Sequence, residues 1–295
     1  MIPVGFVLPP DEATLDILGA FLEEEPDIFE VAPETLWQQV EGRLHTNDYH
    51  ALFLSMGRRS GQRFLAHGVG YSVGGGGSAA EVYRRAQWRA AMARDQALFQ
   101  FLWYTDHLGI TAPAGQNTAL PLPLPMTAEA AECVRLRLDE MSTVVPVVGI
   151  ENPASHFVCG NPLDEPAFIR SVLQNPSRRL LLDLANVFAM ASNLGFDAEE
   201  YLAALPLDQV IEIHMAGGTD SDPRWLPGGR SLRLDGHDGP IPPEVWRLLD
   251  VALPRCSHLR AIVLERMEGT IADSDVGLLR EEMRRLRSCV VKQAA

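Results

Sequence analysis

The chain has 295 residues, of which 46% are hydrophobic and 22% are charged, a composition typical of a globular protein with a sizeable core. Its net charge of −14 argues against a nucleic-acid surface, because phosphate contacts draw on clustered Lys and Arg. No apolar run approaches the roughly 18 to 20 residues of a transmembrane helix. The opening residues MIPVGFVLPPDEAT lack the basic start of a signal peptide. We therefore expect a cytoplasmic protein without a membrane partner.

Short apolar segments alternate with helix-like stretches along the whole chain. Apolar residues three and four positions apart predict helices within 78–100 and 126–144. This alternation predicts a (β/α)8 TIM barrel in a single domain, residues 1–295, with a doubly wound open sheet as the alternative. The predicted strands are 2–8, 27–32, 64–69, 101–108, 147–152, 180–185, 210–216 and 261–266.

Two irregular loops, 74–77 and 217–240, follow predicted strands. Loops at the carboxyl ends of the strands carry the active sites of TIM barrels. We therefore expect both loops near the functional site.

Polar side chains end six consecutive predicted strands, and the carboxyl ends of barrel strands meet at one mouth. In LLLDLANV, Asp183 ends an apolar strand, where an unpaired buried charge costs several kcal/mol. This pattern predicts a polar cluster at the mouth. Its members are His67, Asp106, His107, Glu151, Asn152, Asp183, His214 and Glu265, with Asp235 and His237 in the loop after the seventh strand.

Four carboxylates at one mouth repel one another unless cations lie between them. A mixture of histidines and carboxylates suits iron, zinc or manganese, and about two or three ions would find enough ligands. The four cysteines form no CxxC pair, which excludes a thiolate site. The sequence therefore predicts a metal centre and leaves the metal open. The four acids are Glu151, Asp183, Asp235 and Glu265.

Other polar residues near these strand ends have more than one interpretation. We expect Asp106 to accept a hydrogen bond from a ligand histidine rather than to bind metal. Glu30 and Glu34 either line the mouth or are solvated or capping residues. Asn186 is either a ligand or a cap of the next helix.

A series of motifs follows along nearly the whole chain, roughly from Val4 to Glu265: FEVAPETLW, HGVGYSVGG, TDHL, LPLPLP, IENPASHF, LLLDLANVFAMASNLGFD, VIEIHMAGG, DGHDGPIPPEVWRLL and VLER. As a series they resemble the DUF692 family, the multinuclear non-heme iron-dependent oxidative enzymes (MNIO). The resemblance implies a TIM barrel that holds two or three irons, mixed-valent Fe(II)/Fe(III), and uses O2 as co-substrate. Such enzymes oxidise a residue, often cysteine, of a ribosomally synthesised precursor peptide (RiPP biosynthesis). Some of them work with a small partner protein that binds the leader peptide.

The resemblance also implies the metal ligands, motif by motif. His67 lies in HGVGYS, His107 in TDHL and Glu151 in IENP. The remaining ligands are Asp183 and Asn186 of DLAN, His214 of HMAGG, Asp235 and His237 of DGH, and Glu265 of VLER.

Two residues depart from the family pattern. Gly218 stands where the family has the second histidine of HLAGH, and Met267 stands where it has the acid of ERD. Neither departure removes an implied ligand. Both alter the surroundings of the pocket, so the particular family reaction is left open.

Three functions follow from these observations. The first is an iron- and O2-dependent oxidase that modifies a peptide. The second is another metal-dependent TIM barrel, a sugar isomerase or an endonuclease-IV-like zinc hydrolase, although the acidic charge argues against DNA as its substrate. The third is a non-catalytic metal- or peptide-binding relative, supported only by the glycine at position 218.

Overall fold

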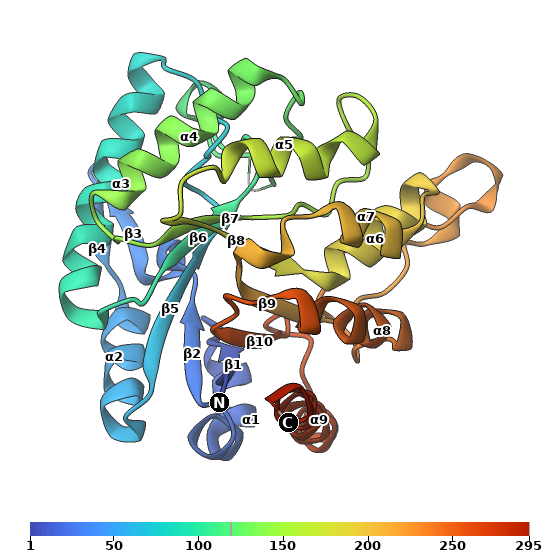
Figure 1. Ribbon diagram of the computed structural model, residues 1–295. Coiled ribbons are helices and arrows are strands. Elements are labelled where there is room, and N and C mark those ends of the chain that lie inside the picture. Colours follow the sequence, from blue (N-terminus) through green and yellow to red (C-terminus); the bar gives the residue numbers. More distant parts are fainter. Residues whose placement is uncertain (119, 295) are drawn as a thin grey trace.

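The computed structural model describes residues 1–118 and 120–294, and its parallel strands close into a barrel (Figure 1). The strands follow one another around the barrel in the order β1-β10-β9-β8-β7-β6-β5-β2. All eight coincide with predicted strands, which confirms the TIM barrel and excludes the open sheet. Their bounds are β1 Val4–Val7, β2 Ile28–Val31, β5 Arg63–Gly68, β6 Tyr104–His107, β7 Val148–Glu151, β8 Arg178–Asp183, β9 Val210–Ala216 and β10 Ala261–Glu265.

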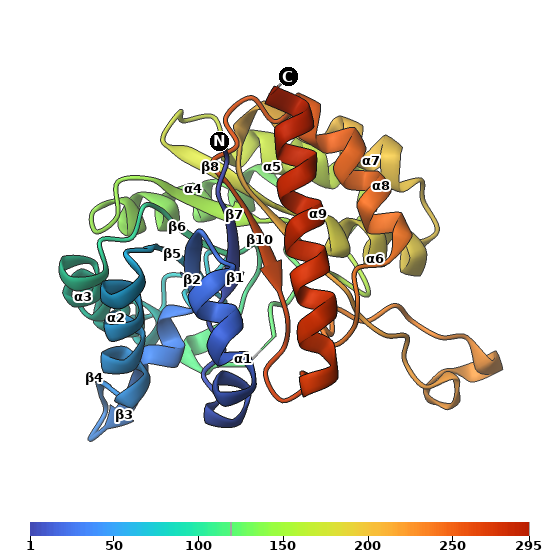
Figure 2. The same ribbon diagram turned by 90° about the horizontal axis from the view of Figure 1, so that it is seen from below.

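Helices surround the barrel, and Figure 2 shows α1 and α9 beside β1 and β10. Within the described part of the chain, no helix combines the length and apolar character needed to cross a membrane. The helices are α1 Glu12–Glu24, α2 Asp48–Ser60, α3 Ala79–Phe99, α4 Ala128–Ser142, α5 Glu165–Val172, α6 Leu184–Leu194, α7 Ala198–Ala204, α8 Pro243–Ala252 and α9 Val276–Ala294.

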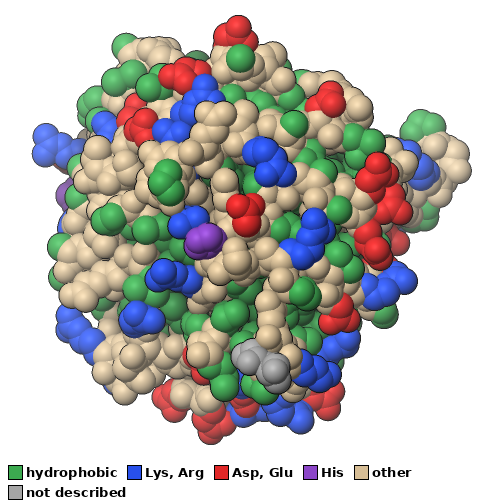
Figure 3. Space-filling model, in the orientation of Figure 1, with side chains coloured by type: hydrophobic (Ala, Val, Ile, Leu, Met, Phe, Trp, Pro, Cys, Tyr) green, Lys and Arg blue, Asp and Glu red, His purple; other side chains and the backbone are tan. Residues whose placement is uncertain are grey.

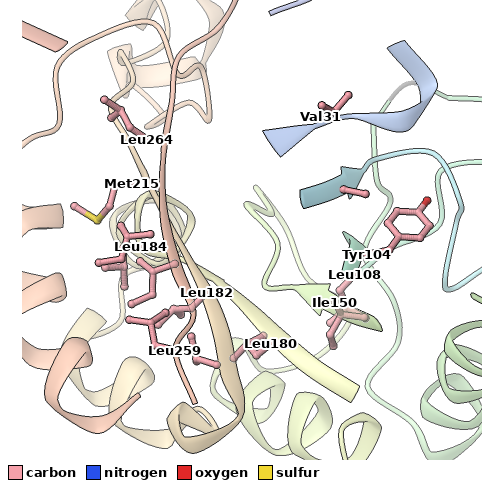
Figure 4. Packing of buried hydrophobic residues seen from close by; sticks show 14 of the residues in the cluster. Val31, Tyr104, Leu108, Ile150, Leu180, Leu182, Leu184, Met215, Leu259 and Leu264 are labelled. Atoms are coloured by element: carbon pink, nitrogen blue, oxygen red, sulfur yellow. The ribbon is translucent and has the colours of Figure 1, made fainter. Parts of the chain in front are cut away.

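The alternation of side chains along each strand separates an outer layer from the barrel interior. Leu180 and Leu182 of β8 pack in the outer layer, where Figure 4 shows them on the same side of the barrel as Met215 and Leu264. Asp183 is the next residue after Leu182, so it points inward. Its charge therefore lies inside the barrel rather than among the helices.

A hairpin of two antiparallel strands, β3 Trp37–Val40 and β4 Arg43–Thr46, lies outside the barrel and was not predicted. Its turn places Glu41 and Gly42 at φ values of +49° and +76°, as tight hairpin turns require. The indole N–H of Trp37 donates to Asp95 of α3 at 2.5 Å and anchors the hairpin. Because most of its other residues are exposed, the hairpin has little apolar pattern to predict it from.

The loop at 74–77 is held against helices α3 and α4. Arg85 Nη1 donates to the carbonyl of Gly76 at 3.0 Å, and Gly76 N donates to Glu81 at 2.9 Å. A Cβ atom on Gly74 would lie 2.4 Å from Leu124, so close packing requires a glycine there. The first half of the loop is therefore closely packed, whereas Gly77 has open space around it.

Candidate metal centre

Histidines and carboxylates from six strands and from the loop after β9, all of them buried or half-buried, meet at the carboxyl end of the barrel. Their ligand atoms form three groups in which all atoms lie within 4.8 Å of one another. Each group mixes imidazole nitrogen with carboxylate oxygen, the donors that suit first-row metals. The groups are His67 with Glu151 and His214, Glu30 with His214 and Glu265, and Asp183 with His237 and Glu265.

Glu151, at the end of β7, lies between three histidines. Its Oε2 atom is 3.0 Å from Nε2 of His107 and 3.5 Å from Nε2 of His67, and its Oε1 atom is 3.8 Å from Nδ1 of His214. The rings of His67 and His107 stack with their centroids 5.0 Å apart. Burial alone would raise the pKa of Glu151, but His107 and His67 lower it to about 2. Glu151 is therefore an anion, the form in which a carboxyl group binds a metal ion.

His214 of β9 is fully buried between two carboxylates. Its Nε2 atom forms a hydrogen bond of 3.1 Å with Oε2 of Glu30, while its Nδ1 atom lies 3.0 Å from Oε2 of Glu265 without one. Burial disfavours the imidazolium, yet Glu265 and Glu30 hold the pKa of His214 well above its usual range. With Nε2–H donating to Glu30, Nδ1 is the ring nitrogen that a cation would bind, in exchange for the proton that the raised pKa keeps there.

A third group joins the end of β8 to the loop after β9. Oδ1 of Asp183 accepts from Asn186 N at 2.6 Å, and Oδ2 has no hydrogen-bond partner among the described residues. Burial, reinforced by Glu151 and Asp235, raises the pKa of Asp183 well above its ordinary value. A cation beside Oδ2 would offset that repulsion. The Asp235 Oδ1 atom lies 2.6 Å from Nε2 of His237.

The unpaired polar atoms of the cluster fit bound metal ions. Buried polar atoms are nearly always hydrogen-bonded, so several unpaired ones at a single site need an explanation. Bound cations would give these atoms partners without any rearrangement of the strands. Without a hydrogen-bond partner in the described residues are Glu151 Oε2, Asp183 Oδ2, Asn186 Oδ1, His214 Nδ1, Asp235 Oδ1, His237 Nε2 and Glu265 Oε2.

The structure separates the two interpretations of Asn186. Asp183 is the N-cap of α6, so the interpretation of Asn186 as its cap is wrong. The amide nitrogen of Asn186 donates to Asn152 O at 3.0 Å and lies 3.5 Å from Oε1 of Glu151. Its buried oxygen is left available to a cation.

Asp106 does not support a ligand histidine as predicted. It accepts from Tyr71 N at 3.1 Å and from the Tyr104 hydroxyl at 3.2 Å, whereas Nδ1 of His67 meets Thr105 Oγ1 at 2.9 Å. The reason is strand alternation, because Thr105 faces the interior opposite His67 and Asp106 faces the other way. Thr105 is thus a contributor that the sequence analysis missed.

Glu30 and Glu34 have different roles. Glu30, 1% exposed at the end of β2, joins the cluster, and burial raises its pKa to about 8. Glu34 accepts from Val69 N at 2.7 Å and braces the segment after β5. In the sequence, Glu30 stands between apolar Phe29 and Val31, which places it on the opposite face of β2 from them without indicating which face is the inner one.

The loop at 217–240 projects from the molecule near the carboxyl ends of the strands (Figure 2). An antiparallel bridge between Asp220 and Arg233 makes its outer part an arm, which we define as residues 219–234. A Cβ atom on Gly218 would lie 2.7 Å from the Leu234 carbonyl oxygen. The backbone of the arm at Leu234 therefore packs directly against the backbone of Gly218, where a side chain would not fit. Met267 N donates to His237 O at 2.9 Å. This hydrogen bond holds His237 in place, with its backbone at a φ of +46°.

The fold and this site together define a TIM barrel with a mouth lined by histidines and carboxylates. The family model described as "RiPP precursor modification enzyme MbnB/TglH/ChrH" matches residues 15–290 of the chain. The chain therefore belongs to this family of enzymes that modify precursor peptides, and the resemblance in the motifs is confirmed.

Relatives of similar length support this membership. The chain is 36% identical over 201 residues to a UPF0276 protein of Rhizorhabdus wittichii, covering 68% of this chain and 67% of the relative. It is 33% identical over 258 residues to a UPF0276 protein of Pseudomonas aeruginosa, covering 86% and 82%.

Solved structures with the same barrel are more distant in sequence. A xylose isomerase domain protein from Planctomyces limnophilus aligns with a TM-score of 0.59 at 12% identity, covering 99% of this chain and 97% of that one. Endonuclease IV from Thermus thermophilus aligns with a TM-score of 0.52 at 16% identity, covering 96% and 99%. These similarities show the fold alone.

Proposed function

We propose that this protein is an iron- and O2-dependent oxidase that modifies a residue, with cysteine as the first candidate, of a ribosomally synthesised precursor peptide. The observation that carries the proposal is the set of unpaired ligand atoms inside the barrel mouth, in a chain that belongs to a peptide-modifying family. A small leader-binding partner protein is part of the proposal.

The ligand assignment follows the three groups of donors. About two or three iron ions would be held by nitrogen and oxygen donors only, which suits Fe(II) and Fe(III). Iron bound here would supply the activation of O2 and the oxidation of the peptide. The proposed ligands are His67, His107, Glu151, Asp183, Asn186, His214, Asp235, His237 and Glu265.

The surrounding residues orient the ligands. Glu30 fixes the ring of His214 through Nε2, and Thr105 fixes the ring of His67 through Nδ1. Each bond leaves the other ring nitrogen directed at the cluster. The side-chain amide of Asn152 donates to the carbonyl oxygen of Asp183 and accepts from its backbone N–H, at 2.9 Å each. These two hydrogen bonds join the ends of β7 and β8, where Glu151 and Asp183 lie.

A peptide substrate suits the rim of this mouth. Large apolar side chains are exposed on the segments that follow four of the barrel strands, where they offer contacts to an extended chain. Trp225, 69% exposed on the arm, is the largest of them. The others are Leu120 and Leu122 after β6, Phe157 and Leu163 after β7, and Met267 after β10.

The direct test is co-expression with the short peptides encoded beside the gene, with and without any small neighbouring protein, followed by mass spectrometry of the peptides. We expect a mass change that requires both iron and O2 and that is lost in Glu151→Gln. Glu129→Gln, an exposed acid on α4, is the matched control and should behave as wild type. An unchanged peptide with fully iron-loaded protein, or modification without O2, would contradict the proposal.

A further inference from the structure

A cavity lies at the opposite end of the barrel from the candidate metal centre. Its volume is about 670 Å³, within the range of sites for small organic ligands. It is lined by the residues that begin the strands: Arg63 starts β5, Arg179 lies one residue into β8 and Arg260 precedes β10. The metal ligands end the same strands, so the two sites are separate.

Three arginines surround this cavity without partners. Among residues 1–118 and 120–294, no hydrogen bond or ion pair involves the guanidinium groups of Arg63, Arg179 or Arg260. Figure 3 looks onto this end of the barrel and shows several basic side chains and one histidine around its centre, with one acidic side chain among them. In a chain of net charge −14, this concentration of positive charge is a local exception.

The floor of the cavity is apolar. Trp103 and Ile211 are buried there, and Val147 is half-buried beside them. The indole N–H of Trp103 already donates to Glu212 at 2.7 Å, so Trp103 offers the cavity only its apolar surface. A ligand that fills this space therefore meets an apolar floor and a cationic rim.

We propose that this cavity binds an organic phosphate with an aromatic body. Guanidinium groups match phosphate oxygens in charge and in fork geometry, and a phosphate group carries close to two negative charges for several arginines to share. The aromatic body would stack on the apolar floor near Trp103. Arg63, Arg179 and Arg260 would hold the phosphate at the rim, and the site is independent of the proposed oxidase activity.

Isothermal titration of the full chain with ADP and with FMN tests the proposal. We expect at least one of them to bind with a Kd below about 1 mM, and adenosine and inorganic phosphate to bind more weakly, because each supplies only half of the contacts. Absence of binding by both ADP and FMN overturns the proposal. Phosphate binding as tightly as either nucleotide overturns the role of the apolar floor.

A pair of double variants separates the site from general electrostatics. Arg63→Gln with Arg260→Gln should weaken nucleotide binding by at least about tenfold, since each substitution removes a charged hydrogen-bond donor. Arg43→Gln with Arg230→Gln removes the same charge from exposed, unpaired arginines of the β3–β4 hairpin and the arm and should leave the Kd within about twofold. Equal weakening in both pairs overturns the proposal. All four positions are exposed, so circular dichroism should show both variants folded.

Discussion

The Nε2 atom of His214 lies 3.1 Å from Oε2 of Glu30, and this hydrogen bond joins β9 to β2 across the buried interior of the barrel. The bond occupies one ring nitrogen of the histidine. The other, Nδ1, is left facing Glu265 and Glu151. Glu30 thus determines which nitrogen of His214 is available to a metal ion.

Glu30→Gln should weaken metal binding without removing a proposed ligand. The amide keeps the volume but replaces the carboxyl group that orients the ring of His214 through Nε2, so we expect metal affinity to fall about 10- to 100-fold. Competition with a chelator of known affinity measures the loss. Glu23→Gln, an exposed residue of α1, serves as the control. Equal affinities for Glu30→Gln and wild type would show that the hydrogen bond has no such role.

Substitutions at Asn186 test whether its free oxygen is a ligand. Asn186→Ala removes the oxygen and should lower the metal content by up to one ion per chain. Asn186→Asp keeps an oxygen at the same place and adds a charge that metals favour, so its metal content should stay near wild type. Elemental analysis of both purified variants provides the comparison. If the two variants retain metal equally, the oxygen of Asn186 is not a ligand, and Asn186 acts only through its hydrogen bond to Asn152.

Gly218→Ala should destabilise the protein. The new Cβ atom would lie 2.7 Å from the Leu234 carbonyl, and the resulting backbone shift costs about 1–3 kcal/mol. Gly19→Ala is the matched control, since an exposed position in α1 with open space around it should gain up to about 1 kcal/mol. Urea unfolding of the two variants should give opposite signs. An unchanged free energy of unfolding in Gly218→Ala would mean that the arm shifts at no cost to make room for the new methyl group.

Glu165 of α5 makes stability depend on pH. Burial raises its pKa from the ordinary 4.5 to about 7, although the Tyr201 hydroxyl donates to it. Between these values the folded protein binds more protons than the unfolded chain, so the free energy of unfolding falls as pH rises from about 4.5 to 7. The full difference corresponds to about 3 kcal/mol.

Glu165→Gln should remove this dependence. Relative to wild type, the variant should gain up to about 3 kcal/mol in unfolding free energy between pH 5 and 8, because its amide is neutral throughout. Glu199→Gln, exposed on the neighbouring α7, should leave the pH dependence unchanged. Parallel unfolding curves for Glu165→Gln and wild type at every pH would contradict the assignment.

The barrel and most of the cluster were predictable because both depend on local pattern. Apolar runs define the strands, and Asp183 or Glu265 at the end of such a run lies at the mouth once the barrel closes. The orientation of Glu30 was not predictable. Its alternation with Phe29 and Val31 gives two faces, and the sequence does not say whether the polar face meets solvent or the barrel interior.

Features that depend on contacts between distant parts of the chain were missed, because local sequence pattern does not specify such contacts. Asp106 was expected to accept from a ligand histidine, whereas strand register gives that role to Thr105. Arg63, Arg179 and Arg260 are separated by about a third of the chain each, and only barrel closure brings them to one cavity. Local pattern carries no signal for such groupings.

The most direct test of the central claim is elemental analysis of the chain purified without chelators, in metal ions per chain. We expect about two or three irons, the number that the proposed ligands can hold. Glu151→Gln should contain less. Zinc or manganese in place of iron would contradict the oxidase and favour a hydrolase or an isomerase, and a chain free of tightly held metal would contradict the metal centre itself.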